Sequence, residues 1–90
     1  MTKLGRWAVI DIETSGIDPT YDQIIDLGFL QFEGTKLIRK YSSLVKSDVV
    51  LSQFIQKLTG IKQEEVRRAP HWNKVEPDLL DLEGHALIAH

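Results

Sequence analysis

Two carboxylates separated by one residue, Asp11 and Glu13, are the side chains in this sequence with the clearest chemical potential. They interrupt a short apolar run at 7–12 that is rich in β-branched residues, and 14–16 then read as a turn. Because alternate residues of a strand point to the same side, both carboxylates emerge together at the predicted strand end. Like charges held this close repel unless a cation compensates them, and their oxygens suit Mg²⁺ or Mn²⁺. The pair predicts a divalent metal site, although a solvated strand edge or a helix cap has the same pattern.

Composition limits the kind of protein that could carry such a site. Ninety residues, 42% hydrophobic and 27% charged, are typical of one small soluble domain. The absence of cysteine excludes disulfides, zinc–thiolate sites and cysteine nucleophiles, and it suits a cytoplasmic protein. The formal net charge of −2 gives no basic footprint, so metal would have to supply positive charge toward a nucleic-acid partner. No apolar run reaches the length of a membrane span and no signal-peptide pattern is present, so no membrane partner is expected.

The first half of the chain is predicted to form a meander of three strands. The predicted order is a strand at 7–12, a loop of turn formers at 17–22, a strand at 23–33, a tight turn at 34–35 and a strand at 36–46. Such short links join antiparallel neighbours. Gly28 inside the second strand predicts a bulge or a close backbone approach. The basic cluster of Lys36, Arg39 and Lys40 is interpreted as a solvated strand edge.

The second half changes to helical spacing. Apolar residues at 51, 54, 55 and 58 predict a helix with Gly60 as its C-terminal cap, and 63–68 predict a short helical turn. A longer apolar face follows over 72–82, in which Pro77 predicts either a kink or a helix start near Glu76, with Gly84 ending the helix. The run 86–89 reads as a fourth strand, and a helix between two strands favours a right-handed crossover to a parallel partner.

The fourth strand raises an expectation about the extent of the chain. It reads as a central buried strand, yet nothing after His90 covers or flanks it. We therefore expect a truncated sequence, in which residues 1–90 are the N-terminal part of a single domain. The open edge is expected to favour a homodimer, a strand swap or aggregation.

Several segments in order resemble the DnaQ-like (DEDD) 3′–5′ exonucleases, the family of the proofreading subunit of bacterial DNA polymerase III. The first motif of that family, D-x-E-T-[TS]-G, stands at 11–16, and its I-I-E-I-G strand resembles 24–28. L-V-K stands at 44–46, with Ser47 in place of the usual proline, L-T-G-I at 58–61 and L-[VI]-A-H at 87–90. D-x-E-T alone is a weak signal, whereas this order of motifs over nearly the whole chain is a strong one.

The resemblance implies an RNase H-like α/β fold: a three-stranded antiparallel meander, helices, and a fourth strand parallel to the first, truncated before the rest of the domain. It implies a 3′–5′ exonuclease of proofreading or repair type that hydrolyses the terminal phosphodiester of DNA with two divalent ions, Mg²⁺ or Mn²⁺. Asp11 and Glu13 would be the catalytic metal ligands, and Glu13 would also meet the 3′-terminal hydroxyl. The substrate contacts that it implies come from Ile12, Thr14, Ser15, Leu58, Thr59 and His90.

The sequence also lacks several residues of the active site of this family. It carries two of the family's four metal carboxylates and lacks the general base, a His or Tyr of a later motif. His90 resembles the first residue of the H-N-x-x-F-D motif, in which a later Asp takes the metal. Because two-metal hydrolysis needs fixed geometry between ions and a base within reach of the water, we expect the 90-residue chain alone to be inactive. Asp26, where the family usually has Glu, either faces the site or has a packed or solvated role.

The sequence leaves alternatives open for the substrate and for the class of protein. RNA-directed members of the superfamily usually read D-L-E-M-T-G at the first motif, so Ile12 and Thr14 favour DNA. Single-stranded or 3′-terminal DNA is therefore expected as the partner ahead of RNA, with polymerase subunits as further candidates. From a different class, a non-catalytic α/β module for binding or assembly would have no metal affinity.

Overall fold

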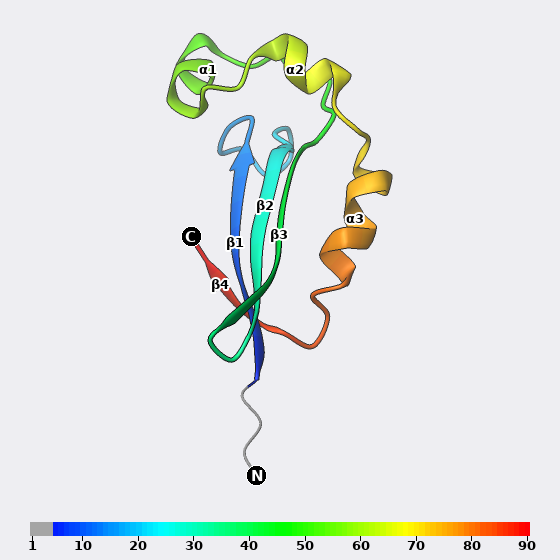
Figure 1. The fold of residues 1–90 in the computed structure, drawn as a ribbon. Helices are drawn as coiled ribbons and strands as arrows, with labels where there is room; N and C mark the ends of the chain where they lie inside the picture. The colour runs from blue at the N-terminus through cyan, green and yellow to red at the C-terminus, as the bar shows by residue number, and fades with distance from the viewer. Residues whose placement is uncertain (1–4) are drawn as a thin grey trace.

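A computed structural model of the chain describes residues 5–90 and consists of a four-stranded sheet with three short helices (Figure 1). In chain order the elements are β1 (Arg6–Thr14), β2 (Ile24–Glu33), β3 (Lys36–Leu44), α1 (Gln53–Thr59), α2 (Gln63–Arg68), α3 (Trp72–Leu80) and β4 (Ala86–Ala89). The order across the sheet is β3-β2-β1-β4. The predicted sequence of a meander, helices and a final strand is confirmed.

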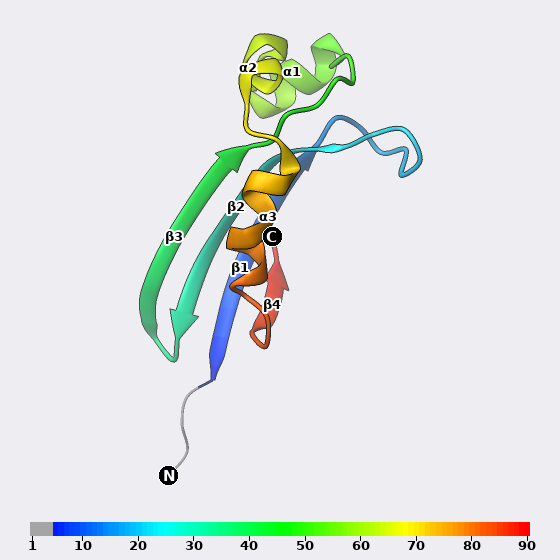
Figure 2. The same cartoon turned by 90° about the vertical axis from the view of Figure 1, so that its right-hand side faces the viewer.

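The pairing within the sheet is mixed. β1 and β3 both run antiparallel to β2, whereas β4 runs parallel to β1, with Val9 opposite Ile88. The connection from β3 to β4 carries all three helices, and α3 lies along one face of the sheet (Figure 2). The prediction of a fourth strand parallel to the first is confirmed. β1 reaches Thr14 and so is longer than predicted, which places both carboxylates inside the paired strand.

The helix ends follow local capping chemistry in α1 but not at the end of α3. Ser52 caps α1 by accepting a hydrogen bond from the Ile55 N–H, and Gly60 ends it at φ 76°, as predicted. α3 begins at Trp72 and passes through Pro77, so a helix start near Glu76 was wrong. It ends at Leu80 rather than at Gly84, because the turn at 81–84 carries Leu82 back into the core.

The core lies between α3 and one face of the sheet, with a second part under α1 and α2. Leu82 packs with Ala8 and Phe29, and Val75 of α3 packs with Leu27 and Val45. The second part joins the start of β2 to the first two helices through Ile25, Leu51, Ile61 and Val66. Burial of these side chains is the main stabilising contribution that holds the helices to the sheet. Among the described residues, no helix has the length and apolarity needed to cross a membrane.

Gly28 lies in a regular stretch of the β1–β2 ladder, and a bulge there was wrong. The ladder shifts register between Glu13 and Thr14, and the β2–β3 ladder shifts between Gln31 and Phe32. A Cβ placed on Gly28 would lie 3.6 Å from the Tyr41 carbonyl oxygen, an ordinary van der Waals distance. The backbone approach is therefore not unusually close. What Gly28 does instead is leave the sheet surface bare beside Asp11, its partner across the ladder.

Candidate functional site

Asp11 and Glu13 lie on the face of the sheet that α3 does not cover. Ala8 and Ile10 of β1 pack toward Leu79 and Leu82, so the alternate residues of the strand point to the other side. Across the ladder, Asp11 is opposite Gly28 and Glu13 is opposite Asp26. Three carboxylates therefore share the same end of this open face, two of them as predicted from their spacing.

The pKa of Asp26 reflects the short distances among the three carboxylates. The pKa of its carboxyl is raised, first by partial burial and then by the negative charges of Glu13 and Asp11. Of the two roles left open for Asp26, the one that faces the site agrees with its position in the ladder. The raised pKa means that the ionised form of Asp26 is disfavoured beside Glu13 and Asp11, and a cation there would offset this cost.

The donor chemistry fits a divalent ion, but these residues alone do not enclose one. Carboxylate oxygens are hard ligands, and Mg²⁺ commonly takes one or two carboxylates and keeps several waters. Among the described residues there is no group of three or more His, Cys, Asp or Glu side chains placed to hold a metal. Asp11 and Glu13 thus fit as two ligands of an ion whose coordination would be completed by other oxygens.

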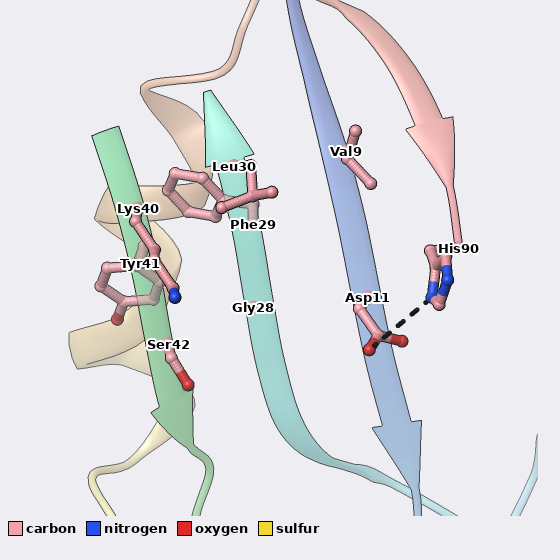
Figure 3. Close-up of a pocket in the computed structure, with 9 residues that line it drawn as sticks. All are labelled: Val9, Asp11, Gly28, Phe29, Leu30, Lys40, Tyr41, Ser42 and His90. Atoms are coloured by element: carbon pink, nitrogen blue, oxygen red, sulfur yellow. Dashed lines mark ion pairs between the residues drawn. The ribbon is translucent and has the colours of Figure 1, made fainter. Parts of the chain in front are cut away.

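His90 is brought next to Asp11 by the parallel pairing of β4. Its N–H donates to the Ile10 carbonyl at 2.9 Å, which extends the ladder by one residue. The imidazole Nδ1 then lies 4.0 Å from Asp11 Oδ2, with both side chains largely exposed (Figure 3). The sequence-predicted site residues Asp11 and His90, 79 positions apart in the chain, are therefore neighbours in space.

A shallow groove of about 400 Å³ crosses the open face beside this pair. Figure 3 shows Lys40 and Ser42 on β3 across bare Gly28 from Asp11 and His90. The groove is open because Gly28 has no side chain where a larger residue would fill the middle of the sheet. It places one cationic side chain, that of Lys40, on the same face as the carboxylates.

The loop that follows β1 is fixed by Ser15 and Asp22. The Ser15 hydroxyl donates to Asp22 Oδ1 at 2.8 Å and accepts from the Gln23 N–H at 2.9 Å, while Asp22 Oδ2 accepts from the Asp18 N–H at 2.9 Å. Ser15 is only 6% exposed, so its hydroxyl is engaged within the protein. A Cβ on Gly16 would collide with the Asp22 carboxylate, which explains the glycine there. Sequence reasoning did not single out Asp22, whose only signal is a carboxylate in a loop of turn formers.

One predicted substrate contact, Ile12, has its side chain on the face of the sheet that α3 covers. Ile12 lies with Leu79, Leu80 and Leu87 on the α3 side of the sheet, so its side chain is not on the face of Asp11. Only its main chain runs between the two carboxylates.

Thr14 and Thr59 use their hydroxyls locally. The Thr14 hydroxyl donates to the Gly16 carbonyl at 2.6 Å. The Thr59 hydroxyl donates to the Ile55 carbonyl at 2.8 Å and accepts from the Ile61 N–H at 3.1 Å.

Leu58 remains 68% exposed on α1, which lies beyond the C-terminal end of β1 in both views (Figures 1 and 2).

Exposed apolar side chains gather in the segments around this end of the sheet. Sequence reasoning had placed Leu58 near the substrate but had not singled out Ile17 or Tyr21 in the loop after β1, or Phe54 on α1. Ile17 is fully exposed and Phe54 is 70% exposed. The periodicity of a strand or a helix does not reveal such residues. An apolar residue is assigned to the core from its sequence, and only the packing shows that it is exposed.

Comparison with known proteins identifies similar chains. The family model described as an exonuclease, named for RNase T, matches residues 8–90. The chain is 34% identical over 85 residues to the "3′-5′ exonuclease DinG" of Staphylococcus saprophyticus, with 93% of this chain and 9% of that protein covered. It is 36% identical over 87 residues to the "DNA polymerase III PolC-type" of Caldanaerobacter subterraneus, with 96% and 6% covered. The chain thus spans less than a tenth of the length of these relatives.

Solved structures resemble the fold over nearly the whole chain. E. coli exonuclease I in complex with a dA16 oligonucleotide superposes with a TM-score of 0.78 at 16% identity, covering 96% of this chain and 20% of that one. A 3′-exonuclease that recognises the 3′ end of a histone mRNA stem-loop superposes with a TM-score of 0.72 at 25% identity, covering 88% and 30%. The mixed four-stranded sheet with its helices is therefore part of an RNase H-like exonuclease fold.

Proposed function

Since the chain belongs to the exonuclease family whose model matches residues 8–90, we propose that it supplies part of the active site of a metal-dependent 3′–5′ exonuclease. The reaction would be hydrolysis of the terminal phosphodiester of DNA, with release of a nucleoside monophosphate. The observation that carries the proposal is the placement of Asp11 and Glu13 together on the uncovered face of the sheet, with Asp26 opposite Glu13. A cation at this point would offset the negative charges of the three carboxylates, and nucleic-acid hydrolysis uses such ions.

Asp11 and Glu13 would hold the divalent ions, and Glu13 would also meet the 3′-terminal hydroxyl. When bound, such ions lower the pKa of water and stabilise the leaving oxygen. The hydrogen bonds between Ser15, Asp22 and Gln23 would keep the main chain after Glu13 rigid against the terminal nucleotide. In this proposal Ile12 and Ser15 contribute main-chain groups, since the Ile12 side chain faces α3 and the Ser15 hydroxyl is engaged.

The remaining contacts would come from elements that meet this end of the sheet. Leu58 and Thr59 at the end of α1 would lie beside the terminal base, with the Thr59 hydroxyl fixing the turn into Gly60. His90, whose imidazole lies beside Asp11 (Figure 3), would contact the substrate from the parallel edge. These roles follow from the family motifs, and the positions of the side chains are compatible with them.

DNA is proposed as the substrate ahead of RNA. The two relatives described above are named as a 3′–5′ exonuclease and as a DNA polymerase III, which agrees with Ile12 and Thr14 in the first motif. A similar fold that recognises an mRNA stem-loop makes an exoribonuclease the second candidate. Association with polymerase subunits belongs to the same proposal, as a proofreading role would require it.

We further propose that residues 1–90 are the N-terminal part of one exonuclease domain and are inactive alone. Two carboxylates give too few ligands to fix a pair of ions, and the described residues place no third ligand with them. The chain spans about a tenth or less of its relatives, which leaves room in those proteins for the remaining ligands and the general base.

The test is calorimetric titration of the chain with Mn²⁺, compared with an Asp11→Asn/Glu13→Gln variant. We expect weak binding that the double variant loses, whereas Glu33→Gln, a carboxylate that pairs with Arg6 at the other end of the sheet, leaves it unchanged. Absence of binding, or equal binding by the double variant, would favour a non-catalytic module. In parallel, a 3′-labelled oligonucleotide with Mn²⁺ should stay intact; shortening that depends on Asp11 and Glu13 would disprove the inactivity of the chain.

A further inference from the structure

We propose that Phe54 of α1 is a stacking platform for an unpaired base of the substrate strand, upstream of the terminal nucleotide. This inference rests on the proposed function and adds to it a base-contacting residue outside the family motifs. It starts from the two sides of α1. Ile55 packs against the buried cluster of Ile25, Leu51, Ile61 and Val66, whereas Phe54 and Leu58 are 70% and 68% exposed.

Phe54 and Leu58 form one apolar surface because residues four apart lie on the same side of a helix. Val50, three residues before the helix, is also 72% exposed. Single exposed apolar residues need no explanation, but several together on one short element are typical of a binding surface. The ring of Phe54 contributes the largest flat apolar area among them.

The position of α1 near the carboxylates favours a nucleic-acid strand as the partner of this apolar surface. In both views the helix lies beyond the C-terminal end of β1, the end at which Asp11 and Glu13 lie (Figures 1 and 2). The loop that follows β1 brings two further exposed apolar side chains, Ile17 and Tyr21, to the same end. A strand whose terminal phosphodiester is held at the carboxylates would therefore pass this end of the molecule with its preceding nucleotides.

The charge of this segment is complementary to nucleic acid. From Val49 to Lys62 the charged residues are Lys57 and Lys62, and no acidic residue occurs, although the whole chain has a formal charge of −2. Proteins bind single strands by combining cationic side chains along the phosphates with aromatic rings under the bases. Because a base pair hides the base within its stack, a ring of this kind favours an unpaired end.

Binding of 5′-dye-labelled single strands, measured by fluorescence anisotropy with Ca²⁺ in the buffer, tests the inference. The strands differ in one abasic nucleotide, placed at the terminal position or at one of the three positions before it. We expect the abasic change at one upstream position to weaken binding to the wild-type chain by roughly tenfold. Phe54→Ala should abolish that difference and Phe54→Trp should restore it. Leu37→Ala, which removes an exposed apolar side chain at the opposite end of the sheet, should leave it intact.

Each outcome separates this inference from the proposed function. If Phe54→Ala binds all strands as the wild type does, while Asp11→Asn weakens them, the stacking role is wrong and the proposed site stands. If the wild type binds no strand, both are wrong. If Phe54→Ala instead changes the sedimentation coefficient of the free chain, a second copy covers this surface and the stacking role is wrong. Circular dichroism of each variant checks that the fold is retained.

Discussion

The two faces of the sheet are built from the same strands but have opposite properties. On the face toward α3, Ala8, Leu27 and Phe29 are buried among the side chains of the helix. On the other face, the next residues along the same strands leave a groove that is lined by Asp11, whose side chain is 57% exposed. In these strands, residues that pack in the core therefore alternate with residues that face the groove.

The contrast between the faces separates stability from chemistry within one small domain. Phe29 and Gly28 are neighbours in sequence, yet one stacks on Tyr41 in the core and the other leaves the surface bare beside Asp11. Because the period of a strand is two residues, a change on one face need not disturb the other. The proposed site could thus vary without loss of the fold, and four substitutions test that separation.

The largest effect is expected from Leu27→Ala on the α3 face. Leu27 is fully buried with Val45 and Val75, so its truncation should lower the free energy of unfolding by about 3 kcal/mol through lost burial and a cavity. Ile88→Ala on the other face, where the side chain is 51% exposed, should cost far less. Urea denaturation followed by circular dichroism measures both, and Leu27→Val, at about 1 kcal/mol, serves if the alanine variant does not fold. Equal losses at the two positions would contradict the separation of the faces.

Gly16→Ala is expected to have the next largest effect, at the loop that supports the open face. The new Cβ would displace the Asp22 carboxylate and break its bond with Ser15, at about 2 kcal/mol from strain and lost hydrogen bonding. Gly5→Ala is the matched control, since nothing lies within 4 Å of its added Cβ. Hydrogen exchange should show faster exchange at Asp18 and Gln23 with the core amides unchanged. Uniformly faster exchange would mean that the loop and the core are one cooperative unit.

Arg39→Met tests the polar contact between the sheet and α3. The guanidinium pairs with Asp78, lies 3.1 Å from Asp81 Oδ2, and stacks 5.3 Å from the Tyr41 ring centroid. It is partly exposed to solvent, so we expect a loss of about 1 kcal/mol. Lys40→Met, the next residue on the other face, should change stability by less than half as much. A larger loss from Lys40 than from Arg39 would reverse the assignment of the faces.

Arg39 also marks the limit of what the sequence could predict. The strands and the same-side placement of Asp11 and Glu13 follow from local periodicity, and the parallel fourth strand follows from the crossover rule. All are present in the structure. The interpretation of Arg39 as part of a solvated edge was wrong, because its partners Asp78 and Asp81 are about forty residues away. Pairing over such a distance depends on how α3 crosses the sheet, which no local pattern encodes.

In the candidate site, too, local patterns predicted some features, whereas features that depend on tertiary contacts were not predicted. His90 was placed by its motif, but its proximity to Asp11 required the register of β4 on β1. Ile12 was predicted among the substrate contacts, and strand alternation places its side chain on the α3 face, so that only its main chain lies beside the carboxylates. Asp22 was missed because its role depends on a hydrogen bond to Ser15 across seven residues of loop.

Asp26→Asn should give the smallest change, and one of opposite sign. Because burial and the charges of Glu13 and Asp11 raise the pKa of Asp26 in the folded chain, its contribution to stability is fully present below about pH 4 and is lost as pH rises through the raised value. At pH 7 the folded state carries an unfavourable charge there, so the neutral amide should make the chain more stable. Urea denaturation at pH 7 and at pH 3.5 measures this, with the gain expected at pH 7 and absent at pH 3.5. Asp48→Asn, an exposed carboxylate after β3, is the control and should show no such pH-dependent gain. A loss of stability at pH 7 would mean that Asp26 supports the fold, and the open face would then contribute to stability as well as to chemistry.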